Sequence, residues 1–331
     1  MKLRGIEFGH VLDASGVRNF DGRGWWYHHW LKLFGLNFGG STFVAKTTTF
    51  SPNTGNMPLK QDGMTPQEFF PGCIYIDRRA GVALNAVGLS GPGATFLFAH
   101  AGWENQTQPF FLSFMTLPTD LMFGDLMIER PHRQAFGFAH ELTHHLPRFR
   151  APIGIQLNVS CPNVGAMPMA PDEAIVHAHG QIDALARVDV PIMLKVSVTT
   201  PVATALRMAE RTGCDAICVS NTVPFGALPD KIDWIKLFGT ADKAQSPLAK
   251  FGGGGLSGAP LLPLVEAWVR EARAAGFKKP INAGGGILCP ADADRLIDAG
   301  ADSVFLGSIA FLRPTHVART IAHVNRRLGR R

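Results

Sequence analysis

Short apolar runs alternate with amphipathic stretches along most of this chain. The runs that resemble buried strands are FVAK (43–46), VALNAVG (82–88), PFFLSFM (109–115), IGIQLNVS (153–160), IMLKVS (192–197), AICVSN (216–221), PINAGG (280–285) and SVFLGS (303–308). Such runs are typical of strands that are buried on both faces. Helical periodicity appears between them at 132–146, 172–187, 201–212, 261–275, 290–299 and 315–328. The alternation predicts an α/β fold, a (β/α)8 TIM barrel in one domain spanning residues 1–331.

Three stretches depart from the alternation. The first 40 residues lack it, and we expect them to form a cover, either a lid or a floor, across one end of the barrel. Residues 114–134 are unusually apolar for a loop, and residues 222–251 form a long insertion after the sixth predicted strand. Loops of that length are usually functional or mobile, so we place both insertions at the C-terminal face of the barrel.

Polar residues lie where seven of these strands end. They are Lys46, Asn85, Ser113, Asn158, Lys195, Asn221 and Ser308. Barrel enzymes build their active sites at the C-terminal ends of their strands. Seven polar residues at matching ends therefore predict an active site at that face rather than chance variation in packing.

Glycine-rich segments follow late in the chain, at 252–258 (GGGGLSG), 284–287 (GGGI) and 307–308 (GS). Glycine lets backbone N–H groups approach an anion closely, and the loops after strands seven and eight are the usual phosphate site of a barrel. We therefore expect a phosphate-bearing ligand here. The alternative is that these glycines only make tight turns.

Composition narrows the class of protein. The net charge of +6 suits an anionic substrate, and a terminal Arg cluster (326, 327, 330, 331) fits the end of a solvated helix. The five Cys are scattered without CxxC spacing, which indicates reduced thiols. We find neither an apolar run of about 18 residues nor a signal peptide. These features predict a cytoplasmic protein with no membrane or nucleic-acid partner.

The segment Asn-Val-Ser-Cys-Pro-Asn (158–163) ends the fourth predicted strand. A Cys just past a strand end lies near the mouth of the barrel, where a thiol with a lowered pKa acts as a nucleophile or base. The alternative reading of Cys161 is a small buried apolar side chain.

The NVSCPN segment resembles the catalytic loop of dihydroorotate dehydrogenases, and its Cys resembles that of the soluble class 1 enzymes. Other motifs similar to that family occur in the same order between about residues 12 and 315. They are LDASGV (12–17), AKTTTFSPNTGN (45–56), LNAVGLSGPG (84–93), VSNT (219–222), GGLSG (254–258), AGGGI (283–287) and FLGS (305–308). Two departures are the missing Pro two residues after Lys195 and the Ser at position 90.

The resemblance implies an FMN-dependent oxidation of dihydroorotate to orotate in pyrimidine biosynthesis. Cys161 would be the base that takes the C5 proton, while hydride passes from C6 to flavin N5. The implied substrate-binding residues are Lys46, Asn85, Asn158, Asn163, Asn221 and Thr222. The implied cofactor-binding residues are Ala14, Ser15, Gly16, Lys46, Asn158, Lys195, Gly255, Ser257, Gly258, Gly285, Gly286, Gly307 and Ser308. The resemblance also implies two possible partners, a second copy of the chain in a homodimer and an electron-transfer partner subunit.

Alternatives remain open at this stage. The substrate could be another dihydropyrimidine or a related cyclic amide. Residues 140–145 contain HExxH, a zinc-hydrolase signature, although a chance match on an outer helix is the reading we favour, and we expect no metal. Trp25, Trp26, Tyr27 and Trp30 form an aromatic group that we expect in the core of the N-terminal cover.

Overall fold

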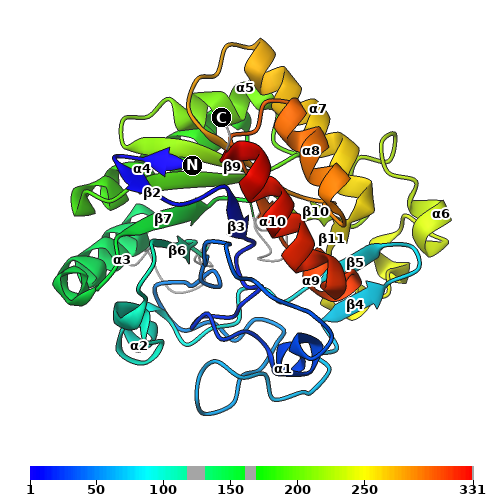
Figure 1. Ribbon diagram of the computed structural model, residues 1–331, viewed down its shortest axis with the longest axis horizontal. Coiled ribbons are helices and arrows are strands. Elements are labelled where there is room, and N and C mark those ends of the chain that lie inside the picture. Colours follow the sequence, from blue (N-terminus) through cyan, green and yellow to red (C-terminus); the bar gives the residue numbers. More distant parts are fainter. Residues whose placement is uncertain (118–130, 161–168, 330–331) are drawn as a thin grey trace, which may run out of the picture.

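A parallel sheet of seven strands forms the centre of the molecule in this computed structural model, which describes residues 1–117, 131–160 and 169–329 (Figure 1). Its strand order is β3 (Val11–Asp13), β13 (Ser303–Leu306), β12 (Ile281–Ala283), β9 (Cys214–Asn221), β8 (Ile192–Ser197), β7 (Ile153–Asn158) and β6 (Phe110–Phe114). The long central strands are buried throughout, as their continuous apolar runs predict.

Residues 42–48 close this sheet into a barrel. They lie between the two edge strands, with parallel bridges from Thr42 to Leu12 of β3 and from Val44 to Phe111 of β6. The Ala45 N–H donates to the Phe111 carbonyl at 2.9 Å, and the Phe111 N–H donates back to the Phe43 carbonyl at 3.0 Å. This segment is the eighth strand position, and the predicted (β/α)8 barrel is confirmed.

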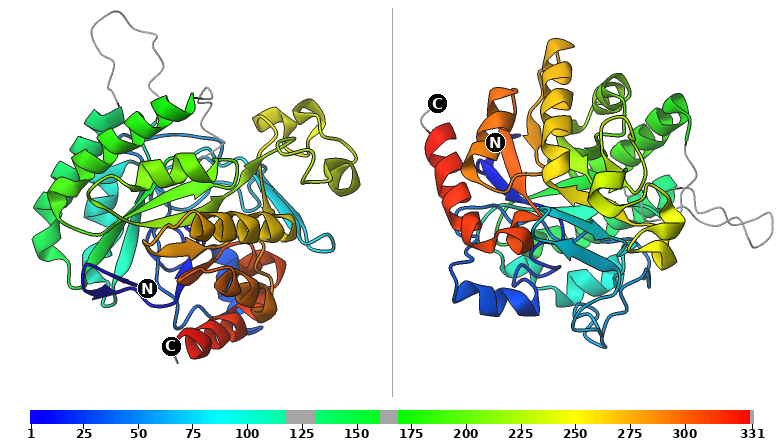
Figure 2. Two further views of the ribbon diagram at one scale, coloured as in Figure 1. Left: turned by 90° about the horizontal axis from the view of Figure 1, so that it is seen from above. Right: turned by 90° about the vertical axis from the view of Figure 1, so that its right-hand side faces the viewer.

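Helices surround the sheet (Figure 2). The six predicted helices are present as α3 (Pro131–His145), α4 (Pro171–Leu185), α5 (Val202–Ala209), α7 (Leu262–Ala274), α8 (Pro290–Asp298) and α10 (Val317–Leu328). Two shorter helices are α2 (Ala94–His100) and α9 (Ile309–Leu312). Their apolar faces, for example Ile182, Ala205 and Val265, are buried against the strands. None of the described helices is long and apolar enough to cross a bilayer.

One strand assignment from the sequence was wrong. Residues 82–88 contain β5 (Val82–Asn85), which pairs antiparallel with β11 (Gly255–Gly258) and β4 (Ile74–Asp77). With β10 (Val223–Pro224), which pairs with β11, these strands form a separate four-stranded sheet. The barrel strand that replaces it is β3, which lies within the residues expected to form the cover. The apolar run of β5 arises because its side chains pack into a second core with Val223, Trp234 and Leu256.

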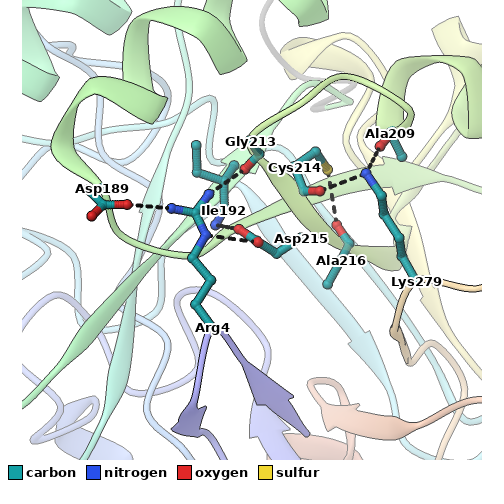
Figure 3. Close-up of polar contacts among 9 residues, drawn as sticks. All are labelled: Arg4, Asp189, Ile192, Ala209, Gly213, Cys214, Asp215, Ala216 and Lys279. Carbon is teal, nitrogen blue, oxygen red and sulfur yellow. Dashed lines mark hydrogen bonds and ion pairs between the residues drawn. The ribbon is translucent and has the colours of Figure 1, made fainter.

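The first residues form the floor of the barrel. The hairpin of β1 (Lys2–Leu3) and β2 (Ile6–Glu7) leads to Phe8, which packs with Phe111 and Met193 inside the N-terminal end of the barrel. Figure 3 shows Arg4 from this hairpin reaching Asp189 at 3.1 Å and Asp215 at 2.9 Å. The expected floor is therefore present, although the same stretch also supplies a barrel strand.

Beneath the same end, polar groups are paired with one another. The Asp215 carboxylate accepts a hydrogen bond from the Ile192 N–H at 2.8 Å, and the Lys279 ammonium donates to the carbonyls of Ala209 and Cys214 at 2.6 and 2.8 Å (Figure 3). These contacts tie the starts of β8 and β9 to the hairpin and to the segment before β12.

Candidate active site

A cavity of about 650 Å³ opens at the C-terminal ends of the barrel strands. Its inner wall comes from the barrel, its side from β5 and β11, and its mouth from α1 (Trp26–Lys32) and the segment before β4. Fourteen of the predicted site residues line it. They are Ala14, Ser15, Gly16, Lys46, Asn85, Asn158, Lys195, Asn221, Thr222, Ser257, Gly285, Gly286, Gly307 and Ser308.

Two asparagines at neighbouring strand ends orient each other. The Asn221 amide, at the end of β9, donates to the Asn158 carbonyl oxygen, at the end of β7, at 3.1 Å. The Ser160 N–H donates to the same oxygen at 3.2 Å, and the Ser160 hydroxyl donates to the Lys195 carbonyl at 3.2 Å. Because its oxygen is occupied, the Asn158 side chain has a fixed orientation with its NH₂ group pointing away from these donors.

Two buried lysines place positive charge at the inner wall. Lys46 follows Ala45 in the closing segment, and its ammonium donates to the Ser90 carbonyl and lies 4.6 Å from the centre of the Phe20 ring. Lys195 lies near the end of β8 and is also buried. Burial of two cations beside an open cavity favours an anionic or electron-rich ligand there.

Glycines bring backbone close to the cavity on the side of β12 and β13. Gly286 has a φ of +83°, and a Cβ added there would lie 2.6 Å from the Leu262 nitrogen. A Cβ at Gly307 would lie 3.1 Å from that of Ala14. This part of the wall therefore has no space for side chains at the glycine positions. It presents backbone and the hydroxyls of Ser257 and Ser308 to a ligand.

Thr47, Ser220 and Trp25 also line the cavity, although the sequence analysis did not predict them as site residues. The Thr47 hydroxyl lies 2.8 Å from that of Ser15, and the Trp25 indole N–H donates to the Gly16 carbonyl at 2.8 Å. The sequence could have indicated Thr47 and Ser220, because they are adjacent to the predicted site residues Lys46 and Asn221. Nothing in the sequence distinguishes Trp25 from the other tryptophans.

The mouth of the cavity is aromatic. Trp26 stacks on Phe69 with ring centroids 3.4 Å apart, and its indole N–H donates to the Phe69 carbonyl at 2.9 Å. Trp30 is 65% exposed and Phe70 is 77% exposed. The expectation that these tryptophans form the core of a cover was wrong for Trp30, because the helix that carries it has its outer face in solvent.

Some predicted residues do not face the cavity. Gly255 and Gly258 lie in β11 on either side of Ser257 but do not line the cavity, and Ser113 is buried beneath it. Cys161 and Asn163 lie outside the described residues. In α3, His140 and His144 have ring centroids 4.4 Å apart, but within residues 1–117, 131–160 and 169–329 no group of three potential ligands could hold a metal ion.

The sequence was compared with known proteins. The family model for dihydroorotate dehydrogenase matches residues 3–328. The chain belongs to the dihydroorotate dehydrogenase family. No curated protein matches the sequence. A solved structure of DHODH from Eimeria tenella in complex with ferulenol matches the fold with a TM-score of 0.67 and 16% identity, over 100% of this chain and 84% of that one.

Enzymes of the dihydroorotate dehydrogenase family are FMN-dependent oxidoreductases, so this chain is one as well. The cavity has the requirements for FMN. Its volume lies in the range of cofactor and drug-sized sites, its glycine-lined side has room for a phosphate, and two cations lie at its inner wall. A Cβ at Gly286 would clash with the Leu262 backbone and one at Gly307 would crowd the Ala14 side chain, so the wall leaves no space for larger residues at these positions.

Proposed function

We propose that this member of the family oxidises dihydroorotate to orotate in the cytoplasm, with Cys161 as base in the manner of the class 1 enzymes. The observation that carries the proposal is the convergence of Lys46, Asn85, Asn158, Asn221 and Thr222 on one cavity that also has a glycine-lined compartment. These residues come from four separate parts of the chain, and no requirement of the fold brings amides and a lysine together at an open cavity.

The residues suit a cyclic amide that carries a carboxylate. Each asparagine offers both a donor and an acceptor, so several can pair with ring N–H and C=O groups without adding charge. The ammonium of Lys46 neutralises a carboxylate. A ligand that lacks the matching groups would leave buried amides unpaired, at a cost of about 1–3 kcal/mol each.

In the proposed reaction the Cys161 thiolate takes the proton from C5 of dihydroorotate. The hydride leaves C6, and the C5–C6 double bond forms. FMN supplies the hydride acceptor when it is bound. Lys195, buried at the end of β8, stabilises negative charge that develops beside it. General base catalysis of this kind contributes about 10²–10⁴-fold to the rate.

Anaerobic titration of the purified, flavin-loaded protein tests this proposal. We expect a yellow protein whose flavin absorbance is perturbed by orotate and bleached by dihydroorotate. Bleaching by other dihydropyrimidines but not by dihydroorotate would favour the second candidate, oxidation of a related cyclic amide. A colourless protein that holds stoichiometric zinc would contradict both.

Lys46→Met separates the two candidates further. If Lys46 pairs with a carboxylate, the variant should lose affinity for orotate much more than for uracil, which has the same ring without the carboxylate. Equal losses for the two ligands would mean that the lysine does not contact the carboxylate. Binding is measured by the change in flavin absorbance.

Turnover also needs an oxidant that removes the electrons. We propose an electron-transfer partner subunit for this role, in an assembly built on a homodimer. The exposed aromatic side chains at the mouth, such as Trp30 and Phe70, offer a surface for such a contact next to the cavity. Steady-state assays with a panel of acceptors, and the mass of the assembly in solution, test these two points.

A further inference from the structure

A row of three hydroxyls runs from the cavity into the buried part of the barrel. Ser15 and Thr47, which line the cavity, have their oxygens 2.8 Å apart, and the Thr47 oxygen lies 2.9 Å from that of Ser113. We call these three residues the hydroxyl chain. They come from the loop after β3, the closing segment 42–48 and β6.

Both ends of the hydroxyl chain meet oxygens that only accept hydrogen bonds. The Ser15 hydroxyl donates to the Ala45 carbonyl at 3.0 Å, and the Ser113 hydroxyl donates to the side-chain oxygen of Gln156 at 3.3 Å. The Gln156 NH₂ group is turned away, toward the Cys218 sulfur at 3.7 Å. Ser113 and Gln156 are 1% and 2% exposed, so water does not replace these partners.

Counting protons shows that the hydroxyl chain is one short. Three hydroxyls supply three protons, whereas four oxygen–oxygen contacts link the Ala45 carbonyl to the Gln156 oxygen. Ser15 and Ser113 use their protons at the two ends, so Thr47 has one proton for the two contacts in the middle. One contact therefore has lone pairs facing each other, and neither Ser15 nor Thr47 has a proton to offer the cavity.

We propose that Thr47 donates to Ser113, that the Ser15 and Thr47 oxygens therefore meet with no proton between them, and that a ring N–H of the bound ligand donates to both oxygens. Gln156 creates this arrangement, although it does not line the cavity, because it accepts the Ser113 proton. The hydroxyl pair of Ser15 and Thr47 then acts only as an acceptor, which favours an N–H edge of a ring over a C=O edge. Gln156 is thus a positioning residue for ligand orientation. This inference rests on the proposed function, because both FMN and dihydroorotate carry ring N–H groups of the kind required.

Affinity measurements on three variants test this inference. Thr47→Val removes the central oxygen with little change in shape. Gln156→Leu removes the terminal acceptor and leaves three protons for three contacts. We expect each to weaken binding about 3–10-fold, the range for loss of one hydrogen bond. Thr47→Ser keeps the hydroxyl and should stay within about twofold of wild type.

Two ligands distinguish the source of the N–H. The dissociation constant of FMN for the apoprotein is measured by quenching of flavin fluorescence, and that of orotate for the flavin-loaded protein by the change in absorbance. Weaker binding of FMN alone would assign the N–H to the flavin, and weaker binding of orotate alone would assign it to the substrate.

Gln181→Leu is the matched control. Gln181 is a buried amide of α4 whose oxygen accepts from the Thr116 hydroxyl at 3.1 Å, and it does not line the cavity. This variant should lose stability as Gln156→Leu does but keep both affinities. The inference is overturned if Gln156→Leu binds both ligands as the wild type does, whatever the result for Thr47→Val. A wild-type protein that binds no FMN would instead contradict the proposed function.

Discussion

The two ends of strands β8 and β9 use polar side chains in opposite ways. At their N-terminal ends Asp215 is paired with Arg4 and with backbone, and the contacts link parts of the protein to one another (Figure 3). At their C-terminal ends Lys195 and Asn221 line an open cavity. The difference shows that one strand can carry stability at its start and ligand binding at its end, although β8 has only six residues and β9 only eight.

Replacing the proposed base, Cys161, should have the largest effect. Cys161→Ala is expected to keep bound FMN and its melting temperature while kcat falls by about 10²–10⁴-fold, because the variant lacks the general base. Stopped-flow reduction of the flavin by dihydroorotate measures the step directly. Cys289→Ala, a change at the start of α8, is the control and should keep wild-type kcat. A Cys161→Ala enzyme with normal flavin reduction would remove this residue from the mechanism.

Removing a contact at the N-terminal ends of β8 and β9 should lower stability and leave kcat unchanged. Arg4→Ala removes hydrogen bonds to Asp189, Asp215 and the Gly213 carbonyl, and we expect a loss of about 1–3 kcal/mol in the free energy of unfolding. The kcat of the folded enzyme should not change. Urea unfolding and steady-state assays measure the two quantities.

Arg23→Ala is the comparison for Arg4→Ala. Arg23 is 84% exposed and pairs with Asp21 at 3.5 Å, so its removal should cost less than about 0.5 kcal/mol. If Arg4→Ala were as mild as Arg23→Ala, the division of roles between the two ends would fail. A lower kcat in fully folded Arg4→Ala would also contradict this division of roles.

The last prediction concerns pH and the helix at the mouth. Burial lowers the pKa of His28 in α1 from 6.5 to about 4, with nearby Lys32, His29 and Arg18 acting in the same direction. The folded protein therefore holds His28 neutral, while the unfolded chain binds a proton near pH 6.5. Stability from this residue is present above pH 6.5 and is lost as pH falls toward 4, by roughly 1 kcal/mol per pH unit.

Unfolding measured between pH 7 and 4.5 tests this dependence. His28→Gln should flatten the decline in unfolding free energy, whereas His29→Gln, at an exposed neighbouring position, should keep the wild-type slope. If both variants declined as steeply as the wild type, His28 would not be the group that titrates.

The sequence predicted the barrel and fourteen of the residues that line the cavity. Buried strands such as Ile153–Asn158 and Ile192–Ser197 are long enough for their apolar runs to be diagnostic. Val11–Asp13 has only three residues and shows no pattern, whereas Val82–Asn85 is apolar because a second core covers it. A local pattern shows that a strand is buried but not to which sheet it belongs. The sequence therefore assigned Val82–Asn85 to the barrel and missed Val11–Asp13.

The site was predicted less completely because some of its features depend on contacts between distant residues. Asn85 lines the cavity as predicted, although its strand β5 does not belong to the barrel. The reason is that the sheet of β5 and β11 forms one side of the cavity. The relation of Gln156 to Thr47 could not be predicted, since it passes through Ser113 of another strand. The exposure of Trp30 depends on how α1 lies against the segment around Phe69, which periodicity over seven residues does not fix.

The pairing of β11 with β5 makes the length of a remote loop matter to the ligand. Ser257 lies opposite Ala83, and Gly255 opposite Asn85, so the two strands present their cavity residues in a fixed alignment. A shift of β11 by one position along β5 would turn Ser257 to the other face of its sheet. Changes of length between 225 and 254 should therefore be tolerated only where the loop takes them up and β11 keeps its register with β5.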